Sequence, residues 1–294
     1  MSTSFAFGQT EFNNFELNYK GGYSATPVEI IPLGATTDTI RMGEANGYEF
    51  GGAAYLNCGL GAEFTYSSHN RYFDTLAGNG TSYSIGLAFR KAGFGPGSLF
   101  DAGFNSAFKI GAGYIHAEKT DQIEYINTEG SRIWTREKSF SGFYADVKLD
   151  IFRDNPFESS DFFFFGASLS AGVKYPMMNK LSESSDGEII NGSWNKEDSV
   201  SIVNVGLEIK PVIIPINNRM GVSLITGISY GNFNSYNVHS PGVNFKVGLS
   251  LDGFIRFGEC ARVTYTRVSR DNYVSNEISF GVEVIKLCRT LFVR

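Results

Sequence analysis

The sequence predicts an all-β fold, namely a single antiparallel up-and-down transmembrane β-barrel of about twelve strands. Three observations support this fold class. Apolar and polar residues alternate with a period of two along many segments, as in strands with two different faces. No segment contains the roughly 18 to 20 apolar residues that a spanning helix needs. Long and short connections also alternate along the chain, which is typical of a barrel with long outer loops and short periplasmic turns.

The alternation is clearest in three segments of the C-terminal half. From Phe162 to Tyr175, Leu169 and Val173 share one face with other apolar residues, whereas the opposite face holds glycine, serine and Lys174. The same division recurs from Gly221 to Tyr230 and from Val243 to Arg256. These segments are longer than the five or six residues of an average soluble strand, so they favour membrane-crossing strands.

Nine further strands complete the predicted barrel. Their ranges are 12–23, 47–57, 60–72, 81–92, 101–118, 134–153, 199–216, 261–270 and 275–288. The connections predicted to be long are 24–46, 73–80, 119–133 and 176–198, and those predicted to be short are 57–59, 93–99, 154–160, 217–219 and 258–260. A soluble β-sandwich has no reason to show this alternation.

Tyrosines on the predicted lipid face gather at the long-loop ends of the strands. A phenol ring prefers hydrocarbon and its hydroxyl prefers the headgroups, so this placement predicts an interfacial aromatic girdle. Its members are Tyr23, Tyr48, Tyr66, Tyr83, Tyr114, Tyr175 and Tyr230.

With this alternation, and with 34 glycines and 15% aromatic residues, the chain resembles Gram-negative outer-membrane β-barrel proteins, in style those of the Bacteroidota. The resemblance is one of pattern and carries no sequence motif. It implies export to the bacterial outer membrane, contact with the lipid bilayer and lipopolysaccharide, and insertion by the barrel-assembly machinery. The formal net charge of −5 gives no reason to expect a nucleic-acid partner.

Charged residues occupy the rows opposite the apolar ones, which predicts that they line the lumen. The acidic members are Glu16, Glu49, Glu63, Asp146, Asp150, Glu208, Asp252, Glu277 and Glu283, and the basic members are Lys20, Arg90, Lys109, Lys148, Lys174, Lys210, Lys246, Arg256 and Arg262. A strongly ion-selective pore would show a ring of one sign, whereas these two sets are equal. Balanced charges could cross-link the lumen shut or line a narrow path.

Glycine and serine dominate the inward rows near 166–174 and 221–231. Two interpretations remain open. The small residues leave a cleft for a solute along this wall, or they make room for large lumen residues such as Tyr144, Phe152 and Phe254.

The function expected from this barrel is that of a porin-like channel or transporter for small solutes. The alternative is a non-conducting structural or accessory barrel that docks an envelope or secretion-complex partner. A soluble β protein is the class-level rival.

Signals for chemistry are weak, and we expect neither an enzyme nor a cofactor or metal site. The three histidines are His69, His116 and His239, and they form no pair at metal-ligand spacing. Ser67-Ser68-His69 lies at a predicted outer strand end, so an outer-leaflet lipid acyl hydrolase is the remaining enzymatic alternative.

Two expectations concern domain organisation and cysteine pairing. Residues 1–8 read as the remnant of a secretion signal, which leaves residues 9–294 as the barrel. Cys260 and Cys288 are predicted at the periplasmic ends of two paired strands, where either a disulfide or unpaired thiols would fit.

Overall fold

The computed structural model describes residues 12–26, 30–33, 36–39, 43–73, 76–92, 104–127, 130–153, 163–185, 188–190, 202–217, 219–231, 242–255, 258–270 and 273–283. Within these ranges, thirteen strands form one hydrogen-bonded sheet and two short strands form a separate hairpin. No helix in this part of the chain is long and apolar enough to cross a membrane.

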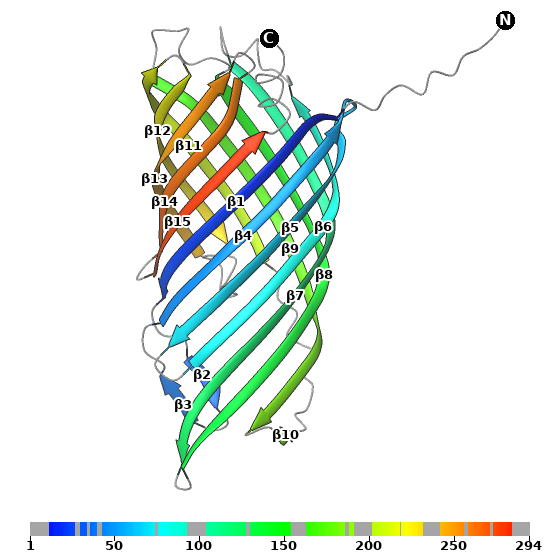
Figure 1. The fold of residues 1–294 in the computed structure, drawn as a ribbon, viewed down its shortest axis with the longest axis vertical. Helices are drawn as coiled ribbons and strands as arrows, with labels where there is room; N and C mark the ends of the chain where they lie inside the picture. Colours follow the sequence, from blue (N-terminus) through cyan, green and yellow to red (C-terminus); the bar gives the residue numbers. More distant parts are fainter. Residues whose placement is uncertain are drawn as a thin grey trace, which may run out of the picture.

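Twelve long strands close the sheet into an antiparallel barrel, and strand β10 (Glu188–Ile190) pairs with β9 as an addition (Figure 1). Each long strand pairs with its sequence neighbours in the barrel, and the ring closes through β1 and β15. The predicted fold class is therefore confirmed. The twelve strands are β1 (Phe12–Thr26), β4 (Gly43–Leu56), β5 (Leu60–Phe73), β6 (Leu76–Ala92), β7 (Phe104–Asn127), β8 (Gly130–Arg153), β9 (Phe163–Ser185), β11 (Ile202–Asn217), β12 (Met220–Gly231), β13 (Gly242–Ile255), β14 (Gly258–Arg270) and β15 (Tyr273–Glu283).

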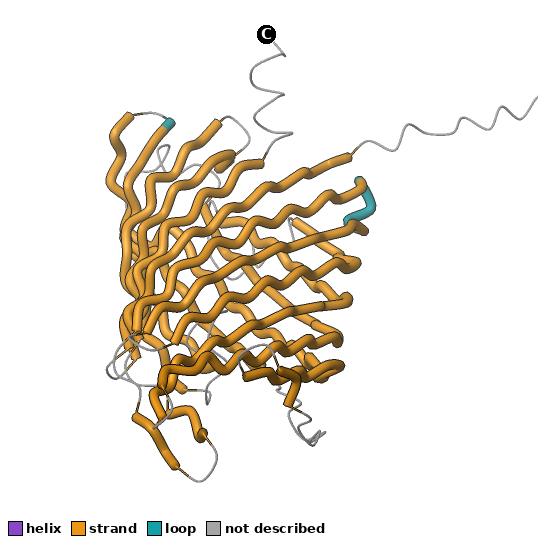
Figure 2. The backbone as a smooth tube through the Cα atoms, turned by 60° about the horizontal axis from the view of Figure 1, so that its bottom comes forward, coloured by secondary structure: helices purple, strands orange, loops and turns teal. Residues whose placement is uncertain are grey.

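A tight turn between β4 and β5 marks one end of the barrel, which we call the turn end (Figure 2, teal). β1 begins there, because Phe12 pairs with Leu56. Gly59 has a φ of 90° in this turn, and a Cβ at this position would collide with the carbonyl oxygen of Arg90. The turn therefore requires glycine.

At the opposite end, which we call the hairpin end, the longest strands extend furthest. β7 and β8 stay paired as far as Asn127 and Gly130, and this hairpin projects beyond the neighbouring strands at the bottom of Figure 1. The short strands β2 (Ile30–Leu33) and β3 (Thr36–Thr39) also lie at this end (Figure 1).

Several strands continue into segments that the sequence predicts as connections. β6 begins at Leu76, β7 and β8 occupy most of 119–133, and β9 continues to Ser185. The sequence pattern ends earlier than the strands because alternation reports which face meets apolar surroundings, whereas strand pairing depends on backbone hydrogen bonds. Beyond Tyr114 the outward face of β7 becomes polar, with Glu118 and Gln122 exposed.

The two faces of the barrel are reversed with respect to a soluble protein. Outward-facing Leu87 and Phe143 are each 66% exposed, whereas inward-facing Ser250 is 1% exposed and Asp252 is 0% exposed. Within the described residues, one buried apolar cluster consists of Ala53, Tyr55 and Ala88. An apolar outer face around a polar interior is the arrangement of transmembrane barrels.

A belt of tyrosines crosses the outer face between the aliphatic zone and the polar hairpin end. We define the tyrosine belt as Tyr19, Tyr48, Tyr66, Tyr83, Tyr114, Tyr175 and Tyr230, all of which are at least 36% exposed. Tyr19 stacks on Tyr48 at 6.5 Å between ring centroids, Tyr48 lies 6.2 Å from Tyr66, and Tyr83 lies 6.3 Å from Tyr114. Tyr19 is an addition to the predicted girdle, whereas the side chain of Tyr23 lies outside the described residues.

Candidate functional site: the barrel lumen

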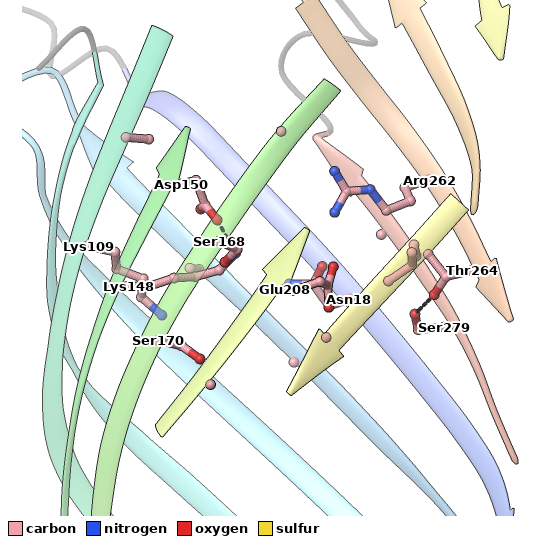
Figure 3. Close-up of a pocket in the computed structure, with 18 of the residues that line it drawn as sticks. Asn18, Lys109, Lys148, Asp150, Ser168, Ser170, Glu208, Arg262, Thr264 and Ser279 are labelled. Carbon is pink, nitrogen blue, oxygen red and sulfur yellow. Dashed lines mark hydrogen bonds and ion pairs between the residues drawn. The ribbon is translucent and has the colours of Figure 1, made fainter. Parts of the chain in front are cut away.

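The lumen contains a cavity of about 810 Å³, to which all twelve long strands contribute lining residues. Figure 3 shows Lys109, Lys148 and Asp150 on one side, and Glu208 and Arg262 on the other. The alternation that turns aliphatic residues outward turns these charged residues inward. Charged side chains therefore line part of the cavity, and the barrel wall surrounds it.

One wall of the lumen carries an ion cluster built from β5, β7 and β8. Lys109 forms ion pairs with Glu63 and, at 3.8 Å, with Asp146. The hydroxyl of Tyr144 donates a hydrogen bond to Glu63 Oε1 at 2.9 Å. Each carboxylate in this cluster thus faces a cation or a hydroxyl donor, which offsets the cost of placing charge inside the barrel.

Tyr144 reaches Glu63 by lying along the wall over two glycines. Gly86 and Gly113 are paired across β6 and β7, and a Cβ on Gly113 would come within 2.7 Å of Tyr144 Cε1. A Cβ on Gly86 would collide with the Tyr144 hydroxyl. The two glycines make room for the ring along the wall.

A second cluster surrounds Asp252 near the turn end of β11 to β14. Its Oδ1 accepts from Lys210 Nζ at 3.0 Å and from Arg262 Nε at 3.1 Å. The hydroxyls of Ser223 and Ser250 also donate to this carboxylate. These four donors explain how a fully buried aspartate is tolerated.

Two further ion pairs lie beside the cavity, and they combine both signs of charge. Lys246 Nζ lies 2.8 Å from Glu208 Oε2, and Lys148 Nζ lies 3.0 Å from Asp150 Oδ1. Arg90 packs over the ring of Tyr55 at 6.0 Å. Among the described residues, the charges beside the cavity form pairs of opposite sign and no ring of one sign.

The small-residue wall of β9, β11 and β12 borders the cavity directly. Its lining members include Gly166, Ser168, Ser170, Gly206, Gly227 and Ser229. Of the large residues that could have filled the lumen, Tyr144 lies over Gly86 and Gly113 of β6 and β7 instead. The side chains of Phe152 and Phe254 lie outside the described residues.

The structure places the predicted lumen residues in three groups. Those that line the cavity are Glu49, Glu63, Arg90, Lys109, Lys148, Asp150, Glu208, Lys210, Lys246 and Arg262. Asp146 and Asp252 join the two ion clusters, Lys174 is paired with Tyr144 in the sheet, and Glu277 is buried. The side chains of Glu16, Lys20, Arg256 and Glu283 lie outside the described residues.

Ser67 and His69 do not lie on the lipid face. Ser67 is 5% exposed, and its hydroxyl lies 2.7 Å from that of Ser82 on β6. His69 lies against Gly80, where a Cβ would collide with the imidazole. Ser67 and His69 share the inward row of β5 with Glu63, so this placement does not support them as a site on the outer surface of the barrel.

The remaining predicted features lie partly outside the described residues. These are residues 1–8, His239 and Cys288, and nothing is described of the side chain of Cys260. Cys58 is an exposed free thiol in the β4–β5 turn. Within the described ranges, no three His, Cys, Asp or Glu side chains are grouped so as to hold a metal ion.

Comparison with known proteins yields similarity in structure only. No known protein family matches the sequence, and no curated protein does. The translocator domain of the autotransporter NalP from Neisseria meningitidis has a TM-score of 0.55 at 13% identity, covering 94% of this chain and 89% of that one. For the transport unit of the autotransporter AIDA-I from Escherichia coli the TM-score is 0.47 at 8% identity, with coverages of 94% and 91%. For the β-domain of the Bordetella autotransporter Brka the TM-score is 0.46 at 12% identity, with coverages of 91% and 98%.

The class of this protein follows from the fold. A closed antiparallel barrel of twelve strands with an apolar outer face is the fold of outer-membrane β-barrel proteins, and the NalP domain shares it. At 13% identity the similarity concerns the fold alone.

Proposed function

We propose that this chain is an outer-membrane β-barrel whose lumen allows small polar solutes to pass. The single observation that carries the proposal is the 810 Å³ cavity, lined by residues of all twelve strands. Pockets of about 300 to 1,000 Å³ accommodate small molecules, so the volume suits a solute of modest size. The NalP domain is named a translocator domain, and passage through a lumen is in keeping with that kind of barrel.

The outer-membrane location is supported by the outer face. On β13, Val243 to Leu251 present five exposed apolar residues on alternate positions, a length that suits the 9 to 11 residues of a tilted membrane strand. The tyrosine belt then marks the outer interface, with lipopolysaccharide above it, and the turn end faces the periplasm. Insertion by the barrel-assembly machinery belongs to the same proposal. A bacterial source of Bacteroidota type stays a proposal from sequence style.

The mosaic of charges supports weak ion selectivity. The carboxylates of Glu63, Asp252 and Glu208 are each paired with a lysine, so neither sign of charge dominates among these groups. Zwitterionic and neutral polar solutes therefore suit this lumen better than a single ion type.

Single-channel recording in planar bilayers tests the proposal. The wild-type protein, refolded and shown to migrate heat-modifiably, should give discrete conductance steps. Ser170→Trp should lower the step size because Ser170 lines the cavity, whereas Leu169→Trp on the lipid face should leave it unchanged. A protein that is folded and inserted but electrically silent would refute the channel.

One observation favours an accessory role as the second candidate. β7 and β8 form a paired hairpin far beyond the tyrosine belt, and β9 continues beside it to Ser185. Such an extension offers an exposed sheet surface to an envelope partner. Replacing residues 120–137 by a short turn should then abolish co-purification of that partner while leaving conductance intact, whereas unchanged co-purification would contradict this role.

A further inference from the structure

A row of polar side chains lies on the outer face of the barrel at the level of the tyrosine belt. Tyr83 on β6 pairs with His116 on β7, and His116 pairs with Ser141 on β8. His116 and Glu118 are two residues apart on one strand, so both side chains project from the same face as Tyr114. The lumen site makes no use of these residues.

The side chains of this row form a connected chain of hydrogen bonds. Ser141 Oγ lies 3.0 Å from His116 Nδ1, and His116 Nε2 lies 3.4 Å from Glu118 Oε1. The ring of His116 packs against Tyr83 at 5.2 Å between centroids, which fixes its orientation. With the proton on Nε2, the imidazole donates to Glu118 and accepts the hydroxyl proton of Ser141 at Nδ1.

Two further donors converge on the same serine oxygen. The hydroxyl of Tyr114 donates to Ser141 Oγ at 2.9 Å, and the amide of Asn179 on β9 also donates to it. A serine hydroxyl has one proton and two lone pairs, so these three contacts satisfy it completely. Serine, histidine and carboxylate connected in this order are the parts of an activated nucleophile.

The surroundings of this row select the substrate class. The neighbouring Phe143 is 66% exposed, and Tyr175 and Met177 are 46% and 45% exposed. The side chain of His116 is 21% exposed, and that of Glu118 is 68% exposed. A polar cluster at the edge of an apolar surface matches a molecule with a polar headgroup and hydrocarbon chains.

We propose that Ser141, His116 and Glu118 form a lipid acyl-ester hydrolase site on the outer surface of the barrel. Its substrate is the ester of a long-chain fatty acid in a membrane lipid, a chemistry that phospholipids and lipopolysaccharide share. Ser141 and His116 are the catalytic residues, and Glu118 is a positioning residue that acts through His116. The inference rests on the proposed membrane location of the tyrosine belt, and it is independent of any conductance through the lumen.

The reaction proceeds in two steps, which are acylation of Ser141 and hydrolysis of the acyl-serine. One of the two donors, Tyr114 or Asn179, must release Ser141 Oγ so that a lone pair is available for attack on the ester carbonyl carbon. The Ser141 proton passes to His116 Nδ1 during this attack, and the released donor can then give its hydrogen bond to the resulting oxyanion. Collapse breaks the bond to the alcohol, which leaves with the proton from His116, and an acyl-serine remains. Water then attacks the acyl carbon and gives a proton to His116, which returns it to Ser141 as the fatty acid departs.

Hydrolysis by the refolded wild-type protein tests this site. The substrates are phospholipid vesicles in one arm and vesicles containing lipopolysaccharide in the other, with released fatty acid identified by mass spectrometry. Wild-type protein should release fatty acid in at least one arm, and the responding arm names the source of the ester. Ser141→Ala and His116→Ala should each lower the rate by about 100-fold or more.

The matched control is Ser139→Ala. Ser139 is on β8, as Ser141 is, and it pairs with Glu118 across the β7–β8 register. This variant should retain the wild-type rate. Glu118→Gln should lower kcat by about tenfold or more with little change in KM, and Glu118→Asp should recover part of the loss. A merely structural role for Glu118 would not lower kcat selectively while leaving KM nearly unchanged.

Covalent labelling of Ser141 in the wild-type protein tests the site without any variant that could fail to fold. A long-chain fluorophosphonate should modify wild-type protein at Ser141, as read by peptide mass spectrometry. Absence of both labelling and hydrolysis in heat-modifiable protein would overturn the site. Such protein could still conduct, so failure here is distinguishable from failure of the channel, and protein that does not insert would instead remove the membrane location on which both depend.

Discussion

Replacing Leu169 by arginine should destabilise the barrel strongly. Leu169 faces outward from β9, is 50% exposed, and is flanked in register by Leu149 and Leu207. It lies six residues from Tyr175 in the tyrosine belt, which is roughly 20 Å along a strand and roughly 14 Å along the membrane normal at a tilt near 45°. Half of an apolar band about 25 Å tall is about 12 Å, so Leu169 lies close to the bilayer midplane.

At this depth an arginine on the lipid face costs about 2 to 4 kcal/mol of unfolding free energy. Reversible denaturant unfolding in lipid vesicles, followed by tryptophan fluorescence and heat-modifiable migration, measures the loss. The control is Ser170→Arg, in which the neighbouring residue projects into the polar cavity and should cost less. Equal losses at both positions would refute the assignment of the two faces.

Three further predictions concern the lumen and the topology. Asp252→Ala should lower the unfolding free energy by about 3 to 5 kcal/mol in the same assay, because it leaves the buried ammonium of Lys210 beside an unoccupied space; a loss below about 1 kcal/mol would contradict the cluster. Gly86→Ala should displace Tyr144 and crowd the backbone oxygen of Ala112, at a cost of about 1 to 3 kcal/mol, and the part of the loss due to Tyr144 should vanish in a Tyr144→Ala background; strictly additive losses would argue against the contact. Cys58, with the other cysteines replaced by serine, should react with a membrane-impermeant maleimide only after the outer membrane is permeabilised, and labelling of intact cells would reverse the topology.

The strand pattern of the apolar zone was predictable from sequence, and the ends of the strands were not. Leu169 and Ser170 differ in polarity because they meet different surroundings, so alternation identifies both faces. Beyond the tyrosine belt polar residues occur on both faces of β7, and the alternation disappears although pairing continues to Asn127. The hydropathy pattern therefore underestimates the length of strands that continue beyond the apolar zone.

The sequence likewise could not predict which charged lumen residues pair with one another. Alternation places Lys210, Asp252 and Arg262 on inward rows, but only the register of β11 to β14 brings them together. Ser223 and Ser250 complete that cluster and give no signal in the sequence beyond their inward parity.

The sequence pattern also could not locate the hydrolase residues that we propose. The alternation that turns Glu63 inward also turns Ser67 and His69 inward, so parity alone argues against that pair on the lipid face. Ser141 and His116 lie far apart in sequence and meet only through the β7–β8 register.

We propose that the apolar outer face of the closed barrel meets lipid and that its lumen is filled with water. Single cysteines at each position from 168 to 173 of β9, spin-labelled in the refolded protein in vesicles, test it most directly. Labels at 169, 171 and 173 should be accessible to oxygen dissolved in the bilayer, and labels at 168, 170 and 172 should be accessible to a water-soluble nickel complex. Accessibility without a period of two, or with the two phases exchanged, would contradict the account.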